Sequence, residues 1–343
     1  MDVSEARGLW DPAGVYINTA SFGIPPRPAW DALQTAMDDW RGGRTSWEQW
    51  GRATEDSRAT FARLVGVDAE RVAVGSTVSE LIGSLVTGLP RGARVVAPEV
   101  EFTSTLFPLL VQERLEVRTV AVSELADAVA DGADAVAFSA VQMSSGEVAD
   151  LDAIAAAAAS SGAITICDAT QAIGWLPFDA NLFDGVTCTA YKWLTSPRGS
   201  AFATVSDRLL ERIVPHSAGW YAGEDVHTSY FGPPLRLARS ARRLDLSPAW
   251  FSWVGAAPAL ELIERVGVEA IHEHDLGLAN RFRAGVGLEP GNSAIVCADL
   301  PGAAQRLERA GIVSAVRGGL LRTSWHLYND EDDVDRVLEL AVR

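Results

Sequence analysis

The chain has 343 residues, of which 48% are hydrophobic and 22% are charged, and these proportions exclude a disordered, collagenous or coiled-coil protein. At roughly 150 residues per domain, this length predicts about two domains, or one large domain that carries a smaller one. The net charge of −16 repels phosphate backbones and anionic lipid surfaces, so we expect neither nucleic-acid binding nor membrane binding.

The cysteines and the first residues indicate the cellular compartment, and the cysteines and histidines also bear on metal binding. The odd count and irregular spacing of Cys167, Cys188 and Cys297 support neither a disulfide framework nor a zinc site. The five histidines show no metal-ligand spacing, so no metal is expected. The N-terminus lacks the basic and apolar stretches of a signal peptide, and no apolar run approaches the ~20 residues of a membrane span. The sequence therefore predicts a soluble cytoplasmic protein.

Between about residues 70 and 205, short apolar runs alternate with helical patterns. This alternation is typical of parallel β-α-β units whose strands are buried on both faces. Two clear helices are predicted at Val78–Val86 and Asp150–Ser160, the second with Asp150 as its N-cap. The predicted strands are Val72–Val74, Arg94–Ala97, Val117–Val120, Ala135–Phe138, Ile164–Cys167, Gly185–Cys188 and Ala201–Val205.

The last third of the chain predicts a smaller α+β part, joined to the sheet by a long helix at Pro248–Val266. The first ~20 residues are too few for a pair of elements and are expected to pack against this part. We therefore predict a large α/β domain of residues 21–260 and a small domain of residues 1–20 and 261–343. The elements predicted in the latter are helices at Val268–Phe282 and Pro301–Ala310, strands at Ser293–Ala298, Ile312–Val316 and Leu320–Ser324, and a last helix from Asp330.

Lys192 is the only lysine in the chain, so arginine supplies the other 28 of 29 cations (29 − 1). A strong bias toward arginine makes lysine scarce, so the simpler alternative is that this one lysine remains by chance. Arginine replaces lysine where only charge matters, but it does not replace a nucleophilic amine, because the guanidinium stays protonated in proteins. We therefore favour a chemical role for Lys192.

Residues that follow the predicted strands are candidates for a binding site, because ligands of open α/β sheets bind beyond the carboxyl ends of the strands. Gly75-Ser76-Thr77 opens a helix, where free N–H groups suit a phosphate, although Ser or Thr there is more often a plain N-cap. Asp168 and Lys192 follow two consecutive strands. A phosphate turn, a lysine that forms an imine and a carboxylate that holds a protonated pyridine are the groups that bind pyridoxal 5′-phosphate.

Several segments then carry a resemblance to a known family: Tyr16–Ser21, Gly75–Thr77, Glu101–Ser104, Asp168–Gly174, Tyr191–Leu194 and Leu321–Asp330. Together they resemble class V aminotransferases, a group of fold-type I pyridoxal-phosphate enzymes that also contains cysteine desulfurases, kynureninases and isopenicillin N epimerase-like proteins. The resemblance spans nearly the whole chain. It implies an aspartate aminotransferase-like fold, with a seven-stranded, mainly parallel sheet between helices and a smaller α+β C-terminal domain.

The resemblance implies roles for the cofactor-binding residues. Lys192 is expected to form an imine with pyridoxal phosphate and later to move the α-proton of the substrate, and Asp168 is expected to keep the pyridine nitrogen protonated. Phe102 takes the place of a ring that stacks on the cofactor, with an ordinary core phenylalanine as the alternative. The other expected contacts are Gln171 with the phenolic oxygen, Ser76, Thr77 and Thr189 with the phosphate, and Gln142, Ser144 and Ser145 with a cofactor oxygen or the substrate.

The resemblance also implies a substrate site and a partner. Arg322 matches the arginine that binds the substrate carboxylate through its planar fork, with a surface salt bridge to Asp330 or Glu331 as the alternative. Asn18 and Ser21, in the matching N-terminal segment, are further candidates for substrate binding. Family members commonly form homodimers with the active site at the interface, so the partner is expected to supply a phosphate ligand, for which Ser247 is a candidate.

Two departures from the desulfurases limit the reaction. No cysteine lies between Ala298 and Arg322, and Cys297 is predicted to be a buried structural thiol, which disfavours persulfide formation. Tyr191 stands where desulfurases have histidine, which favours the kynureninase- and epimerase-like branch.

The resulting hypothesis is a pyridoxal-phosphate enzyme that acts at the α-carbon of a small amino-acid substrate, with amino transfer as the leading reaction. A C–S or C–C lyase is the alternative enzyme, and a cofactor-binding regulatory relic is the alternative without catalysis. A nicotinamide-dependent dehydrogenase is disfavoured, because no Gly-x-Gly-x-x-Gly turn follows an early strand.

Overall fold

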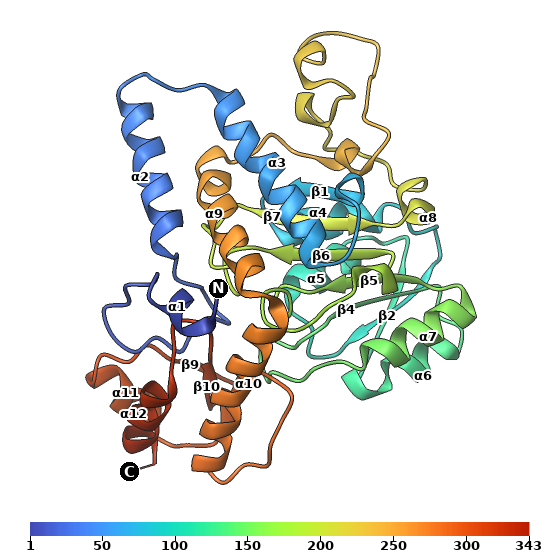
Figure 1. Cartoon of the computed structure of the whole chain (residues 1–343). Coiled ribbons are helices and arrows are strands. Elements are labelled where there is room, and N and C mark those ends of the chain that lie inside the picture. The colour runs from blue at the N-terminus through green and yellow to red at the C-terminus, as the bar shows by residue number, and fades with distance from the viewer. Residues whose placement is uncertain (343) are drawn as a thin grey trace.

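The computed structural model describes residues 1–342, and its centre is a seven-stranded sheet between two layers of helices (Figure 1). The strand order is β1-β7-β6-β5-β4-β2-β3. Strands β3, β2, β4, β5 and β6 run parallel, and β7 is antiparallel to both β6 and β1. The seven strands predicted between residues 70 and 205 all lie within the observed ones, which confirms the α/β fold. Their bounds are β1 Val72–Gly75, β2 Arg94–Pro98, β3 Glu116–Val120, β4 Ala135–Ser139, β5 Ile164–Asp168, β6 Gly185–Thr189 and β7 Ala201–Val205.

Each face of the large sheet is covered by its own hydrophobic core. Successive residues of a strand point to opposite faces, so Val74 lies in one core and Ala73 in the other. The first core includes side chains of α3 (Trp47–Leu64), α6 (Leu125–Ala130), α7 (Leu151–Ser161) and α9 (Trp250–Val266). The second includes those of α4 (Val78–Val86), α5 (Thr103–Leu110) and α8 (Asp207–Leu210). Burial on both faces explains why the central strands are largely apolar, whereas the edge strand β3 is mostly exposed and carries Glu116 and Arg118.

The sequence patterns predict no element for residues 27–64, where the structure has α2 (Arg27–Arg41) and α3. The buried residues of α2 are Ala29 and Ala36, and those of α3 are mostly small or polar. For α3 this leaves no broad apolar stripe to detect, whereas α2 does carry Trp30, Leu33, Met37 and Trp40 at helical spacing, a pattern that the sequence prediction missed. Both helices pack against α9.

The smaller part is built on a separate antiparallel sheet in the order β8-β10-β9. Its strands are β8 Ile295–Ala298, β9 Ala315–Arg317 and β10 Leu320–Ser324, and its helices are α10 Val268–Gly285, α11 Ala303–Arg309 and α12 Glu331–Ala341. The strand expected at Ile312–Val316 begins later than predicted. Its residue Val313 instead forms a bridge with Tyr16 from the N-terminal segment.

The N-terminal residues attach to this small sheet, as expected. After α1 (Val3–Arg7), an extended segment pairs Tyr16 with Val313 and Asn18 with Ser324. The predicted boundary between residues 260 and 261 falls inside α9, and Arg343 lies outside the described residues. The division of the chain into two domains therefore stays a prediction. In residues 1–342, no helix has both the length and the apolar character needed to cross a bilayer.

Candidate active site

The candidate site lies where the carboxyl ends of several strands meet. Asp168 is the last residue of β5, and Lys192 follows the end of β6. Because β5 and β6 are parallel, with Asp168 opposite Thr187, both residues lie at one edge of the sheet. Strand β1 also runs parallel to β6, since β7 is antiparallel to each, so Ser76 follows a strand end at the same edge.

Lys192 is a buried amine, with only 5% of its surface exposed. Its Nζ lies 5.8 Å from the ring centre of Phe102 and 5.8 Å from that of Tyr191. Burial lowers the pKa of Lys192 to about 8, Asp168 opposes this shift, and Arg322 adds to it. A larger fraction of neutral amine is therefore present at physiological pH than for a lysine in water, which suits a nucleophile.

The segment that carries Lys192 is held from two sides. The Gly23 N–H donates to the Tyr191 carbonyl (2.8 Å), and a Cβ on Gly23 would lie 2.0 Å from the Lys192 carbonyl oxygen. Only glycine fits this approach of the N-terminal segment. From the other side, Nε2 of His326 donates to the Trp193 carbonyl (2.9 Å). His326 lies in a matching segment, but no sequence pattern predicts this role for it.

Asp168 is a buried carboxylate with two hydrogen-bond donors. Its Oδ1 accepts from the Thr170 N–H (3.0 Å), and its Oδ2 accepts from the Thr105 hydroxyl (3.2 Å). Burial raises the pKa of Asp168, whereas these bonds and the charge of Lys192 lower it. The donors stabilise the ionised form, which is the form that holds a cation. No sequence signal pointed to Thr105.

Gln171 and Thr189 lie at the same edge. The Gln171 amide donates to the Ala20 carbonyl (2.8 Å) and accepts from the Trp193 indole (2.8 Å), so it joins the N-terminal segment to the Lys192 segment. One amide hydrogen of Gln171 remains for a ligand oxygen. The Thr189 hydroxyl is buried without a hydrogen-bond partner in the described part of the chain. Such an orphaned group fits a contact with a bound phosphate.

Phe102 is 40% exposed, which excludes the alternative of a core phenylalanine. Its backbone is fixed by Glu101, whose carboxylate accepts from the Phe102 N–H (2.8 Å), the Ser139 N–H (2.7 Å) and the Gln142 amide (3.2 Å). One buried carboxylate thus positions two predicted cofactor contacts. Ser144 and Ser145, which follow Gln142, are exposed. Glu101 lies in one of the segments that carry the family resemblance, but no sequence pattern predicts this positioning role.

The turn after β1 already holds an acidic group. The Ser76 N–H donates to Oε2 of Glu80 (3.0 Å), and the Thr77 hydroxyl caps α4 by accepting from the Glu80 N–H (3.3 Å). Thr77 is therefore an N-cap of α4, which was the alternative to a phosphate-binding role for this turn. The Glu80 carboxylate takes the N–H group that a phosphate would use, at the positive end of the helix.

We expect Glu80→Gln to bind phosphate groups about two- to five-fold more tightly, because one negative charge leaves the helix N-terminus. Titration of the apoprotein with pyridoxal phosphate, followed by tryptophan fluorescence, measures the change. Glu211→Gln, an exposed position outside the site, controls for the altered net charge. Unchanged or weaker binding by Glu80→Gln would show that this carboxylate does not compete with the phosphate.

Arg322 is completely buried, with 0% of its surface exposed. Its side chain donates to the Met143 carbonyl (2.8 Å), the Asn18 amide oxygen (3.2 Å) and the Ser21 hydroxyl (2.5 Å). Its Nε is buried without a hydrogen-bond partner within residues 1–342. Burial and the neighbouring Arg317 lower the pKa of Arg322 to about 10. A buried cation with neutral partners and a free donor is suited to bind an anion.

The alternative of a surface salt bridge for Arg322 is wrong. Asp330 pairs with Arg7, and Glu331 lies 3.7 Å from Arg281. The predicted substrate residues Asn18, Ser21 and Arg322 are thus in mutual contact, and the charge of Arg322 acts on Lys192.

Cys297 differs from the prediction of a buried thiol. It lies opposite Arg322 in the register of β8 and β10 and is only partly buried, whereas the other residues of β8 are buried. Its Sγ lies 3.1 Å from the Ser144 carbonyl. Burial raises the pKa of the Cys297 thiol, which disfavours the reactive thiolate.

Two further features lie outside this set of residues. Ser247 is exposed and follows Leu246, whose N–H donates to the Val74 carbonyl (3.3 Å) of its own chain. Its contact with a partner stays a prediction. Within residues 1–342, no cluster of three or more His, Cys, Asp or Glu side chains could hold a metal ion.

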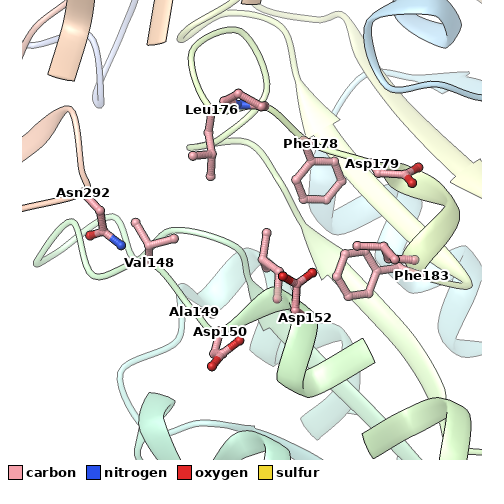
Figure 2. A pocket seen from close by; sticks show the side chains of 12 residues that line it. Val148, Ala149, Asp150, Asp152, Leu176, Phe178, Asp179, Phe183 and Asn292 are labelled. Carbon is pink, nitrogen blue, oxygen red and sulfur yellow. The ribbon is translucent and has the colours of Figure 1, made fainter. Parts of the chain in front are cut away.

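A cavity of about 710 Å³ lies between the start of α7 and residues 176–183, and it contains none of the predicted site residues (Figure 2). Its lining includes three carboxylates, Asp150, Asp152 and Asp179. Asp150 caps α7 as predicted, by accepting from the Ala153 N–H (3.0 Å), and Asp179 caps a 3₁₀ turn. Capping explains two of these acidic groups without a ligand.

Comparison with known proteins gives a consistent result. Residues 35–304 match the family model described as Aminotransferase class-V. An uncharacterized aminotransferase, YcbU of Bacillus subtilis, is 26% identical over 91% of this chain and 89% of its own. Kynureninase of Deinococcus radiodurans is 28% identical over 78% of this chain and 70% of its own. A mutant of the cystine C–S lyase C-DES, with glycine covalently linked to its PLP cofactor, superposes with a TM-score of 0.86 at 20% identity, over 99% of both chains. This likeness confirms the predicted fold.

Proposed function

Because the chain belongs to the class-V aminotransferase family, whose cofactor is pyridoxal 5′-phosphate, we propose that it transfers the amino group of an amino acid. The observation that carries this proposal is the placement of Lys192. The single lysine of the chain is buried at the sheet edge, within the electrostatic influence of both Asp168 and Arg322.

The residues at this edge fit the cofactor. Asp168 offers a buried carboxylate to the protonated pyridine nitrogen, and Phe102 offers an exposed ring face for stacking. The orphaned hydroxyl of Thr189 and the turn at Ser76 and Thr77 offer donors to the phosphate. When bound, pyridoxal phosphate supplies an electron-withdrawing ring that makes the α-proton of an attached amino acid acidic.

The remaining chemistry belongs to residues of the chain. Arg322 binds the α-carboxylate of the substrate through its free Nε and its terminal nitrogens, which fixes the orientation of the α-carbon. Nζ of Lys192, with its lowered pKa, accepts the α-proton and delivers it again. Burial of both side chains excludes water from this transfer.

A C–S or C–C lyase is the second candidate. It is supported by the similarity to a protein named kynureninase and by Tyr191 in the place of the desulfurase histidine. Persulfide formation is less well supported, because the pKa of Cys297 is raised and no cysteine follows it before Arg322. A regulatory relic is disfavoured, because Lys192, Asp168 and Arg322 are all present.

A panel of amino acids, titrated into the holoenzyme, tests the proposal. We expect a change in cofactor absorbance and formation of a keto acid without ammonia or sulfide; ammonia, sulfide or a cleaved carbon chain would instead identify a lyase. Arg322→Ala should weaken binding of α-carboxylates roughly tenfold or more while the cofactor stays bound. Loss of the cofactor with unchanged substrate affinity would contradict the role of Arg322, and a spectrum that no amino acid perturbs would overturn the enzyme hypothesis.

We also propose a cytoplasmic homodimer. Support for the dimer comes from large apolar side chains that the single chain leaves exposed. Phe107 on α5 and Val111, directly after it, are 55% and 72% exposed. Phe231 and Leu235 are 88% and 83% exposed, in the segment between α8 and α9 that projects from the body at the upper right of Figure 1. Pairs of large apolar side chains that a single chain leaves exposed are typical of an interface.

A further inference from the structure

Two arginines converge on one hydroxyl at the substrate end of the site. A terminal nitrogen of Arg322 lies 2.5 Å from the Ser21 oxygen, and a terminal nitrogen of Arg317 lies 3.4 Å from the same atom. The other hydrogen bonds of the two guanidinium groups go to carbonyl and amide oxygens. Neither group therefore has a carboxylate partner within residues 1–342.

The small sheet fixes this arrangement. Arg317 ends β9 and lies opposite Leu320 in the antiparallel register with β10, which also carries Arg322. Residues two apart on a strand share a face, so Arg317 and Arg322 lie on the same face as diagonal neighbours. Arg322 is fully buried on the central strand, whereas Arg317 is only partly buried on an edge strand. The pair thus extends from the interior of the site toward its opening.

The pairing of two cations without an anion is unfavourable in isolation. The two guanidinium groups share the Ser21 hydroxyl, so their charges repel each other, and Arg317 accordingly lowers the pKa of Arg322. The chain has 45 acidic residues against 29 lysines and arginines, so a shortage of acidic residues does not explain why these two arginines lack a carboxylate partner. A ligand with two acidic groups would supply the missing partners, one for each guanidinium.

We propose that the substrate is an amino acid with a second acidic group, which Arg317 binds while Arg322 holds the α-carboxylate. This inference rests on the proposed function, and it narrows the substrate class to dicarboxylic amino acids and their keto acids. Arg317 is then the residue that determines specificity. An amino acid with an uncharged side chain leaves Arg317 without an anionic partner and is bound more weakly.

Binding of simple acids to the holoenzyme tests the site without turnover. Glutarate and butyrate present two and one carboxylates, and isothermal calorimetry gives both affinities. We expect glutarate to bind roughly 10- to 100-fold more tightly than butyrate, and Arg317→Gln to remove this preference while butyrate affinity stays unchanged. Arg309→Gln, an exposed position on α11, removes the same charge and should keep the preference.

Spectral titration with amino acids separates this inference from the proposed function. Glutamate and norvaline should both perturb the cofactor of the wild type, and only glutamate should lose affinity in Arg317→Gln. If the wild-type holoenzyme binds glutamate and norvaline with equal affinity, the role of Arg317 is overturned while the proposed function is retained. Glutarate binding that depends on Arg317, with no spectral response to any amino acid, supports the acidic subsite and overturns the proposed function.

Discussion

Lys192→Ala is expected to leave the fold intact while covalent retention of the cofactor is lost and turnover falls about a thousandfold or more. The side chain is buried between two aromatic rings, and its amine takes no part in the contacts that hold its own segment. Loss of a desolvated cation offsets loss of packing, so we expect the free energy of unfolding to change by less than about 2 kcal/mol. Urea unfolding and cofactor absorbance after gel filtration measure the two effects.

Lys192→Arg is the matched control, because it keeps the charge but has no amine that condenses with an aldehyde. The arginine variant should lose the cofactor as completely as the alanine variant does. Since the chain has no other lysine, borohydride reduction followed by peptide mass spectrometry should find the cofactor at this one side chain. Cofactor attached at the N-terminal amine, or retained after reduction in either variant, would contradict the assignment.

Residues fixed by strand position could be predicted from the sequence. Asp168 and Lys192 follow two apolar runs that read as neighbouring parallel strands, and the rule that ligands bind at the carboxyl ends then brings them to one edge. The turn at Ser76 follows for the same reason. Strand periodicity and end position are local properties, so they can be recognised without knowledge of the fold.

Residues that act through long-range contacts could not be predicted. Glu101 positions Phe102 only because β4 brings Ser139 beside it, and Thr105 reaches Asp168 across 63 positions of sequence. Arg317 gave no signal, because its proximity to Ser21 depends on how the N-terminal segment joins the small sheet. Cys297 was predicted to be buried because it lies in a predicted strand, and no local pattern distinguishes it from its buried neighbours Val296 and Ala298.

A buried pair in the small part carries the second large prediction. Nδ1 of His326 lies 2.8 Å from Oδ2 of Asp275, and both side chains are fully buried. Since the Trp193 carbonyl only accepts, Nε2 of His326 donates to it, and Nδ1 shares a second proton with the carboxylate. Burial raises the pKa of Asp275, and His326 opposes that shift. The pair thus connects α10 to the segment that carries Lys192.

His326→Ala should lower the free energy of unfolding by about 3 to 5 kcal/mol, because it leaves the Asp275 carboxylate buried in the core without its hydrogen-bond partner. The other carboxylate oxygen of Asp275 is already buried without a partner in the described residues. The variant also removes a support of the Lys192 segment, so kcat should fall more than KM changes. His274→Ala, one residue from Asp275 and only partly buried, is the matched control and should cost far less.

A double-mutant cycle separates the pair from simple loss of packing. Asp275→Leu combined with His326→Leu leaves no buried charge, so we expect it to recover much of the stability that either single variant loses. Kinetics should not recover, because the Trp193 carbonyl still lacks its donor. Additive losses of stability would show that the two side chains act independently, and full recovery of kcat in the double variant would show that the bond to Trp193 does not position Lys192.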